Sequence, residues 1–219
     1  MGYNCIRMLH LAIAAAGTLS VIVISEILWR GKKHSSEFIR KTIHMGVGSF
    51  IAFWPWFLSW YDIELSSLVF VLAMIAIALI KPVRKLLSIS VSKSSLGRHT
   101  IGEFFYTYGF VGTAYIAHNR YIFMAAMLHL AIADTVATVL GKKAVKHNIR
   151  YKIFGSQKSL VGTLGFIVSS VVITSVYILL SHTGWMYILY VPIVAAVLEN
   201  LGTYGSDNLL VPVAIALLL

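Results

Sequence analysis

Eight long apolar runs constrain the fold of this chain more than any other feature of its sequence. The runs lie at about residues 8–29, 43–60, 65–80, 100–118, 121–140, 160–180, 185–200 and 208–219. A helix needs about 20 apolar residues to cross about 30 Å of hydrocarbon, and helices and closed barrels are the structures that satisfy their own backbone hydrogen bonds there. The last run has only 12 residues, so it ends partway or packs as a half-span. We therefore expect an all-α, polytopic transmembrane helix bundle of about seven to eight spans.

The composition agrees with a membrane protein and excludes several other classes. The chain is 58% hydrophobic and 12% charged, and its mean hydropathy is +0.83. No nucleic-acid recognition motif accompanies the net charge of +10, so we expect no nucleic-acid partner. The single cysteine, Cys5, has no partner for an internal disulfide. No internal repeat is evident, so we expect one integral membrane domain over residues 1–219.

The basic residues predict the orientation of the helices in the membrane. Loops 30–41, 81–98 and 142–158 hold five, five and six of the eighteen Lys and Arg residues. The positive-inside rule makes these loops cytoplasmic and places the N-terminus outside. Part of segment 81–99 is expected to lie in the interface as an amphipathic helix, and the first run to remain as an uncleaved anchor. The aromatic residues expected at the outer interface are Trp54, Trp56, Trp60 and Tyr61.

An acid followed by a basic, glycine-containing loop is the first candidate for chemistry. Asp134 lies near the end of an apolar run, and a carboxylate there costs roughly 2.5–3.5 kcal/mol on insertion scales, so it is a functional-site hypothesis by default. Asp134 shares a helix face with Thr138, and Gly141 is expected to end the helix or to admit a ligand closely. An alternative is an Asp paired with an Arg of a neighbouring helix. The cationic residues that follow are Lys142, Lys143, Lys146, Arg150, Lys152 and Lys158.

A second candidate cluster precedes the second apolar run. Glu37, Arg40, Lys41 and His44 stand at helical spacings, which place Arg40 above His44 and let Glu37 pair with Lys41. Arg offers planar, two-pronged contacts to a phosphate and Lys offers a point charge. The cluster therefore suits a phosphate or a phosphorylated product, although an ordinary positive-inside flank would look similar.

Further acids lie at the same predicted membrane face. Glu103 falls early in the fourth run between Gly102 and Tyr106, where a buried carboxylate needs a basic partner. Glycines at this point also suit close helix packing. Asp207 and Asn208 follow the last cytoplasmic loop and could cap a helix or bind a ligand. A shared ligand at the cytoplasmic face would explain the gathering, whereas simple neutralisation of neighbouring Lys and Arg is the alternative.

Common nucleotide and metal motifs are missing from the sequence. It has no GxxxxGK[ST] phosphate loop, no GxGxxG, no HExxH and no Cys/His zinc spacing. A CDP-alcohol phosphotransferase would need several spaced aspartates, but Asp134 stands alone in its predicted helix. Any nucleotide chemistry must therefore use a membrane-embedded site.

Five segments in order resemble the CTP-dependent lipid kinase family that includes dolichol kinase, phytol kinase and the yeast-type diacylglycerol kinase. They are EFIRKTIH, GEFFYTYG, ADTVATVLGKK, GSQKSLVGT and SDNLLVP. The resemblance implies a polytopic kinase that moves the terminal phosphate of CTP onto a lipid hydroxyl with a divalent metal, usually Mg²⁺. The residues that match those needed for activity in that family are Arg40, Lys41, Asp134 and Gly141. The chain departs at Val145, where many members have Gly, and at Val161, where Glu is frequent.

The resemblance and the residue chemistry together assign provisional roles. Asp134 is expected to bind Mg²⁺ or to activate the lipid hydroxyl, with Asp207 and Glu103 as further metal or hydroxyl contacts. The transferring phosphate or the product is assigned to Arg40, Lys41 and His44. The CTP-binding set comprises Gly141, Lys142, Lys158, Ser159, Gly162 and Asn208. The expected acceptor is a polyprenol, dolichol or phytol, with diacylglycerol as another candidate; the alternatives are a CDP-lipid-forming cytidylyltransferase and a small anion transporter.

Overall fold

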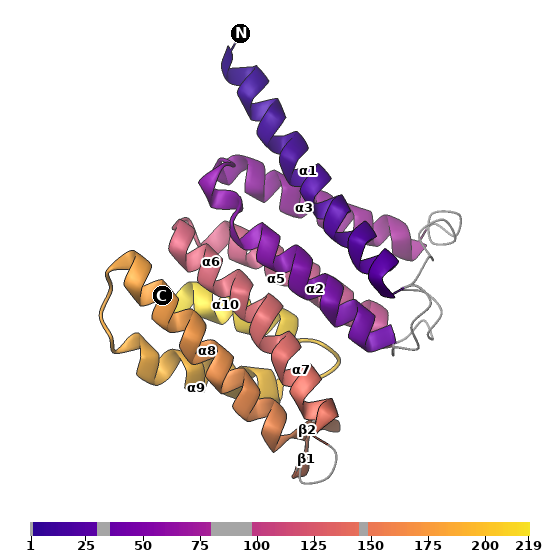
Figure 1. Cartoon of the computed structure of the whole chain (residues 1–219), viewed down its shortest axis with the longest axis vertical. Helices are drawn as coiled ribbons and strands as arrows, with labels where there is room; N and C mark the ends of the chain where they lie inside the picture. Colours follow the sequence, from indigo (N-terminus) through magenta and orange to yellow (C-terminus); the bar gives the residue numbers. More distant parts are fainter. Residues whose placement is uncertain (1, 30–35, 80–97, 145–148) are drawn as a thin grey trace.

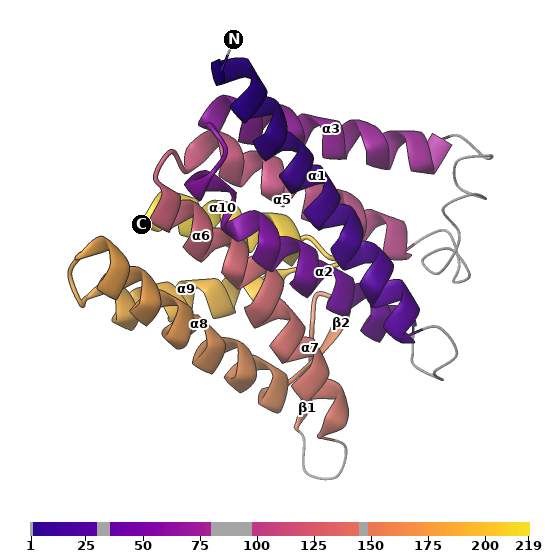
Figure 2. The same ribbon diagram turned by 45° about the horizontal axis from the view of Figure 1, so that its top comes forward.

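The apolar runs fold into a bundle of helices in the computed structural model, which describes residues 2–29, 36–79, 98–144 and 149–219 (Figures 1 and 2). Most of segment 81–99, the predicted interfacial helix, lies outside these residues. The helices and the short strands are α1 Gly2–Trp29, α2 Ser36–Ala52, η1 Trp54–Trp56, α3 Trp60–Leu79, α5 Arg98–Ile116, α6 Arg120–Leu128, η2 His129–Ala133, α7 Asp134–Lys143, β1 Arg150–Ile153, β2 Ser156–Ser159, α8 Leu160–Ser181, α9 Tyr187–Leu201 and α10 Asp207–Leu218.

Three helices of the described part are long and apolar enough to cross a membrane. They cover Asn4–Ser25, Arg120–Lys143 and Leu160–Ser181, while α9 and α10 are shorter apolar helices. The second of these helices runs through α6, the π-helical turn η2 and α7. The all-α class and an integral membrane protein are thus confirmed, whereas the count of seven to eight spans stays a prediction.

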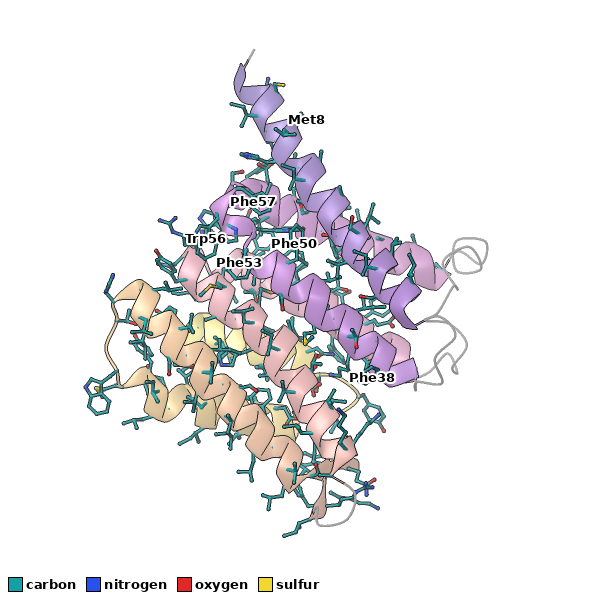
Figure 3. All side chains as sticks on the ribbon, viewed as in Figure 1. Met8, Phe38, Phe50, Phe53, Trp56 and Phe57 are labelled. Atoms are coloured by element: carbon teal, nitrogen blue, oxygen red, sulfur yellow. The ribbon has the colours of Figure 1, made fainter. Side chains whose placement is uncertain are left out.

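The second predicted span, residues 43–60, is not a single helix. Helix α2 ends at Ala52 and a 3₁₀ turn with Pro55 follows, because proline lacks the N–H that a continuing helix needs. The turn carries Trp54 into the core, where it is 2% exposed and packs against Phe70 and Phe110. Trp54 therefore does not belong to an exposed aromatic belt, although the neighbouring Trp56 is exposed (Figure 3).

A two-stranded hairpin interrupts the helices and was not predicted. β1 and β2 pair antiparallel, with Arg150 opposite Ser159 and Ile153 opposite Ser156. The hairpin lies at one end of the bundle, beside the end of α7 and the start of α8 (Figure 1). It carries part of the basic stretch back toward the helices.

Close helix contacts explain two of the glycines. Helix α10 packs along α5, and a Cβ added to Gly109 would collide with the backbone carbonyl of Asn208. Helix α7 packs along α8, and a Cβ on Gly141 would lie 2.7 Å from the Ser159 hydroxyl. The prediction that Gly141 ends the helix is wrong, because α7 continues to Lys143. Gly141 is instead a point of close approach between two helices.

Candidate functional site

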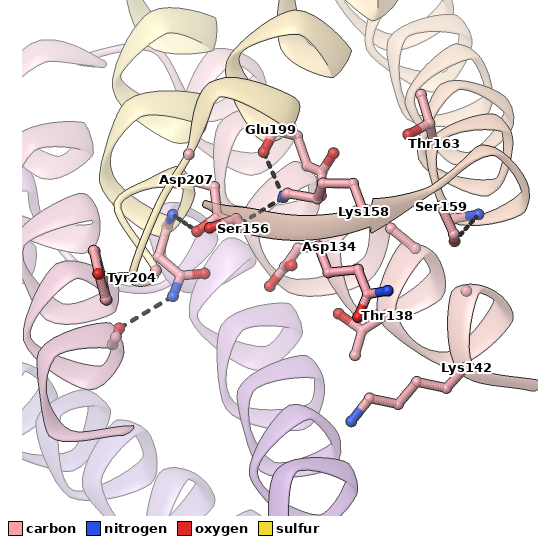
Figure 4. Close-up of a pocket in the computed structure, with 18 of the residues that line it drawn as sticks. Asp134, Thr138, Lys142, Ser156, Lys158, Ser159, Thr163, Glu199, Tyr204 and Asp207 are labelled. Carbon is pink, nitrogen blue, oxygen red and sulfur yellow. Dashed lines mark hydrogen bonds and ion pairs between the residues drawn. The ribbon is translucent and has the colours of Figure 1, made fainter. Parts of the chain in front are cut away.

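A polar cavity of about 680 Å³ lies where α2, α5, α7, the hairpin and the α9–α10 turn meet (Figure 4). It joins segments that are distant in the sequence. Its lining includes most of the predicted site residues, namely Arg40, Lys41, Asp134, Gly141, Lys142, Lys158, Ser159, Gly162, Asp207 and Asn208.

The first contact in this cavity is a buried ion pair between α2 and α7. Lys41 Nζ donates to Asp134 Oδ2, and the two residues are 5% and 7% exposed. The Thr135 hydroxyl donates to the Lys41 carbonyl at 3.2 Å and to the Ala131 carbonyl at 2.7 Å, which ties α2 to the same turn. The alternative of an Asp paired with a basic residue of a neighbouring helix is thus met in part, because the partner is a lysine of α2 and not an arginine.

The second contact joins the hairpin to the two C-terminal helices. Lys158 Nζ donates to Glu199 Oε1 at 2.7 Å and to the Glu199 carbonyl at 2.6 Å, and it lies 3.7 Å from Asp207 Oδ2. Burial alone lowers the pKa of Lys158, but the Glu199 and Asp207 carboxylates outweigh it and raise that pKa above its usual value. Lys158 therefore carries its charge at neutral pH. Figure 4 shows Lys158 extending between the two carboxylates.

Glu199 is a site residue that sequence reasoning did not select. It lies near the end of α9, is 6% exposed and lines the cavity. The available signal was the Glu199-Asn200 pair at the predicted cytoplasmic end of an apolar run. Asn200 also contributes, because its Oδ1 accepts hydrogen bonds from Tyr151 of β1 and Thr163 of α8.

The first turn of α8 allows α7 to approach it closely. The Ser159 hydroxyl accepts the Gly162 N–H at 3.2 Å and caps the helix. A Cβ on Gly162 would lie 2.9 Å from the Ala137 carbonyl, so the glycine lets α7 and α8 touch. On α7, Lys142 is exposed and lines the cavity.

Three buried polar atoms of the lining residues have no hydrogen-bond partner among the described residues. They are Arg40 Nε, Glu199 Oε2 and Asn208 Oδ1. Asn208 is 2% exposed and uses its Nδ2 to donate to the Gly102 carbonyl at 3.1 Å. These three atoms are therefore available to a polar ligand that enters the cavity.

Two predicted residues do not line the cavity. His44 is 8% exposed and its ring packs against Tyr106 in a tilted arrangement, with ring centroids 4.2 Å apart, while the Tyr106 hydroxyl donates to the His44 carbonyl at 3.0 Å. Glu103 lies on α5 within electrostatic range of Arg40. Direct contact of either residue with a ligand stays a prediction.

Two further acids, Asp62 and Glu64, lie apart from this cavity. Asp62 accepts from Arg7 at 2.6 Å, and Glu64 lies 3.2 Å from His118. None of these four residues lines the cavity.

The metal-ligating side chains in the cavity fit a metal ion that is coordinated partly by substrate phosphates better than one coordinated by protein alone. Among the described residues no group of three His, Cys, Asp or Glu side chains is placed to hold a metal ion. Mg²⁺ usually binds through one or two carboxylates and completes its shell with water and substrate phosphates. Asp134 and Asp207, with the unpaired Glu199 and Asn208 oxygens, are oxygen donors of that kind.

Comparison with known proteins identifies the class. The chain is 32% identical over 221 residues to phytol kinase of Synechocystis, and the match covers 96% of this chain and 91% of that protein. No family model matches the chain, and no solved structure matches it. Similarity over nearly the full length of both proteins makes this chain a membrane-embedded lipid kinase. It belongs to the phytol kinase family of CTP-dependent lipid kinases.

Proposed function

We propose that the protein transfers the terminal phosphate of CTP to the hydroxyl of an isoprenoid alcohol, phytol or a polyprenol, at the cytoplasmic face of the membrane. The observation that carries the proposal is the cavity in which Arg40, Lys41, Asp134 and Lys158 meet although they belong to distant segments. We choose phytol as the acceptor because the chain is similar to phytol kinase. We choose CTP as the donor because the chain belongs to a family of CTP-dependent lipid kinases.

Phosphoryl transfer requires mainly positioning and neutralisation of charge on the transferring group. The lipid hydroxyl oxygen forms a bond to the γ-phosphorus, the bond from that phosphorus to the β–γ bridging oxygen breaks, and CDP leaves with the bond electrons. We assign the hydroxyl proton to the Asp134 carboxylate, which is buried at the centre of the cavity. For Asp134 to accept that proton, Lys41 must turn from the carboxylate to the transferring phosphate.

The cationic groups of the cavity divide between two tasks in this proposal. Lys142 and Lys158 hold the CTP phosphates, while Arg40 and Lys41 neutralise the transferring group. Gly141 and Gly162 line the cavity beside these cations, where the nucleotide phosphates would lie near the ends of α7 and α8. Binding of phosphates would also provide acceptors for the unpaired Arg40 Nε.

Asp207 would hold Mg²⁺, with the free oxygens of Glu199 and Asn208 within the same cavity, and binding Mg²⁺ together with Asp207 is the alternative role of Asp134. The ion supplies neutralisation of the β- and γ-phosphate charge when it is bound. Without a ligand, Lys158 pairs with both Glu199 and Asp207, so one ammonium is shared between two carboxylates.

The basic loops support a position of the cavity at the cytoplasmic face of the membrane. The cavity is lined by Lys and Arg of segments 40–41 and 142–158, which belong to the predicted inner side of the membrane. A nucleotide can reach it from the cytoplasm, while the acceptor tail stays among the helices. Neither substrate then has to leave its own phase.

The test uses purified protein in detergent or vesicles with CTP labelled at the γ-phosphate or, separately, at the α-phosphate. We expect γ-label to enter phytol or a polyprenol, and α-label to remain in the nucleotide. Transfer of α-label would show a cytidylyltransferase, and anion uptake without a lipid product would show a transporter. A panel of phytol, farnesol, dolichol and diacylglycerol, offered with CTP or ATP, then identifies the acceptor and the donor.

A further inference from the structure

Two tight turns at the cavity each present an aromatic residue followed by glycine. In the hairpin, Phe154 and Gly155 connect β1 to β2 with φ of 45° and 80°. Between α9 and α10, Tyr204 and Gly205 have φ of 55° and 90°, and the Ser206 N–H donates to the Thr203 carbonyl at 3.0 Å across the turn. Both turns therefore have positive φ at both central residues, the pattern of a type I′ turn.

An aromatic residue is an unfavourable choice for the first central position of such a turn. Type I′ turns favour Asn-Gly, Asp-Gly or Gly-Gly, because a bulky side chain is strained at positive φ. Phe154 and Tyr204 are also 77% and 58% exposed, so core packing does not explain the rings. Among the described residues other than glycine, the only further positive φ is at His182, which does not line this cavity.

Both aromatic residues line the same cavity as the cationic groups. The cations assigned to the transferring phosphate lie deeper, since Lys41 is 5% exposed, whereas the rings lie at exposed turns. In the close-up view Tyr204 lies toward one end of the cavity and Lys142 toward the other, with Asp134 between them (Figure 4). The cavity thus has a charged interior and aromatic groups at its rim.

We propose that Phe154 and Tyr204 form a nucleobase subsite, in which the base of the phosphoryl donor stacks on one or both rings while its phosphates reach the inner cations. The inference rests on the proposed function, because it takes the donor to be a nucleoside triphosphate. Stacking on aromatic side chains suits any base, since every base has a π-face. The subsite therefore accounts for affinity toward nucleotides over bare polyphosphates and does not by itself choose among bases.

The test compares binding of CTP with binding of inorganic tripolyphosphate, which has the phosphates but no base. The full-length protein in detergent is titrated with each ligand, without an acceptor alcohol, as wild type, Phe154→Asn and Tyr204→Asn. Asparagine suits the left-handed position, so these variants remove the ring and keep the turn. Phe154→Tyr keeps a ring, and Trp185→Asn removes an aromatic side chain that is 67% exposed and does not line the cavity.

We expect at least one of the Asn variants at positions 154 and 204 to weaken CTP binding by about 5- to 100-fold, the range that loss of one stacked base would cause. Tripolyphosphate binding should stay within about twofold of wild type in all variants, and Phe154→Tyr and Trp185→Asn should bind CTP normally. Equal losses for CTP and tripolyphosphate, unchanged CTP binding in both Asn variants, or wild-type protein that binds CTP no more tightly than tripolyphosphate would each overturn the subsite.

Failure of the subsite and failure of the proposed function give different results. Wild-type protein that binds CTP through these rings but transfers no γ-phosphate to any alcohol would refute the kinase proposal and keep the nucleobase subsite. Transfer of γ-phosphate with normal CTP binding in both Asn variants would keep the kinase and remove the subsite. If the rings instead anchor the turns to the membrane surface, both ligands will bind the Asn variants as they bind wild type.

Discussion

Replacement of Asp134 by asparagine tests the buried ion pair and the proposed chemistry together. Asp134 and Lys41 are 7% and 5% exposed, so the substitution leaves the Lys41 ammonium buried without its carboxylate partner. Breaking one side of a buried ion pair costs about 3–5 kcal/mol. At about 2–4 °C per kcal/mol for a chain of this size, Asp134→Asn should lower the melting temperature by roughly 6–20 °C.

The same substitution should abolish most of the turnover. A residue that accepts a proton in the transition state contributes about 10²- to 10⁴-fold to the rate, so kcat for transfer from γ-labelled CTP to phytol should fall by about that factor. The double variant Lys41→Met/Asp134→Leu replaces both charged side chains by apolar ones. It should recover most of the melting temperature, because a buried ion pair can be replaced by apolar groups at little cost, but it should remain inactive.

Asp62→Asn is the matched control for Asp134→Asn. It makes the same chemical change at a carboxylate that pairs with Arg7 away from the cavity, and turnover should stay within about twofold of wild type. Wild-type turnover in folded Asp134→Asn protein would remove Asp134 from the reaction. An unchanged melting temperature would refute the claim that Lys41 and Asp134 form a buried pair.

Three further predictions concern other parts of the fold. Lys142→Met should weaken CTP binding roughly tenfold or more, whereas Lys143→Met, which changes an exposed side chain outside the cavity, should not; equal titration curves would refute the assignment. Gly109→Ala should destabilise the protein by about 1–3 kcal/mol in thermal unfolding because α10 backbone already occupies the Cβ position, whereas Gly184→Ala, with open space, should be neutral. The pKa of Lys158 is raised above 10.5, so its ion pairs should stabilise the folded protein until the pH exceeds that value. The difference in melting temperature between wild type and Lys158→Met should therefore stay constant from about pH 7 to pH 10 and shrink only at higher pH. A decline of this difference below about pH 10 would contradict the ion pairs.

Much of the site was accessible from residue types and their order. The isolated acid in an apolar run and the Arg-Lys pair before another run were each costly or unusual enough to select Asp134, Arg40 and Lys41, and all three line the cavity. Lys142 and Lys158 followed from the basic stretch between two runs. These signals are local, because they depend on what hydrocarbon tolerates and on spacing within one helix.

Other features depend on contacts that no local pattern contains. Glu199 could not be chosen as the partner of Lys158, since the two residues are 41 positions apart and meet only because the hairpin folds back on α9. In the same way, His44 has the right helical spacing from Arg40, but Tyr106 of α5 covers its ring. Helical spacing defines which side chains share a face, whereas packing of the neighbouring helices determines what that face meets.

The sequence by itself determined that this protein is a bundle of membrane helices, because the free energy of burying charge and unpaired backbone in lipid leaves few alternatives, and it predicted one face rich in acids and bases. Only the tertiary structure decided which charges pair, that Gly141 serves helix contact and does not end α7, and that two aromatic turns border the cavity. These outcomes depend on which helix faces meet, and each helix leaves that choice open until its neighbours are packed against it.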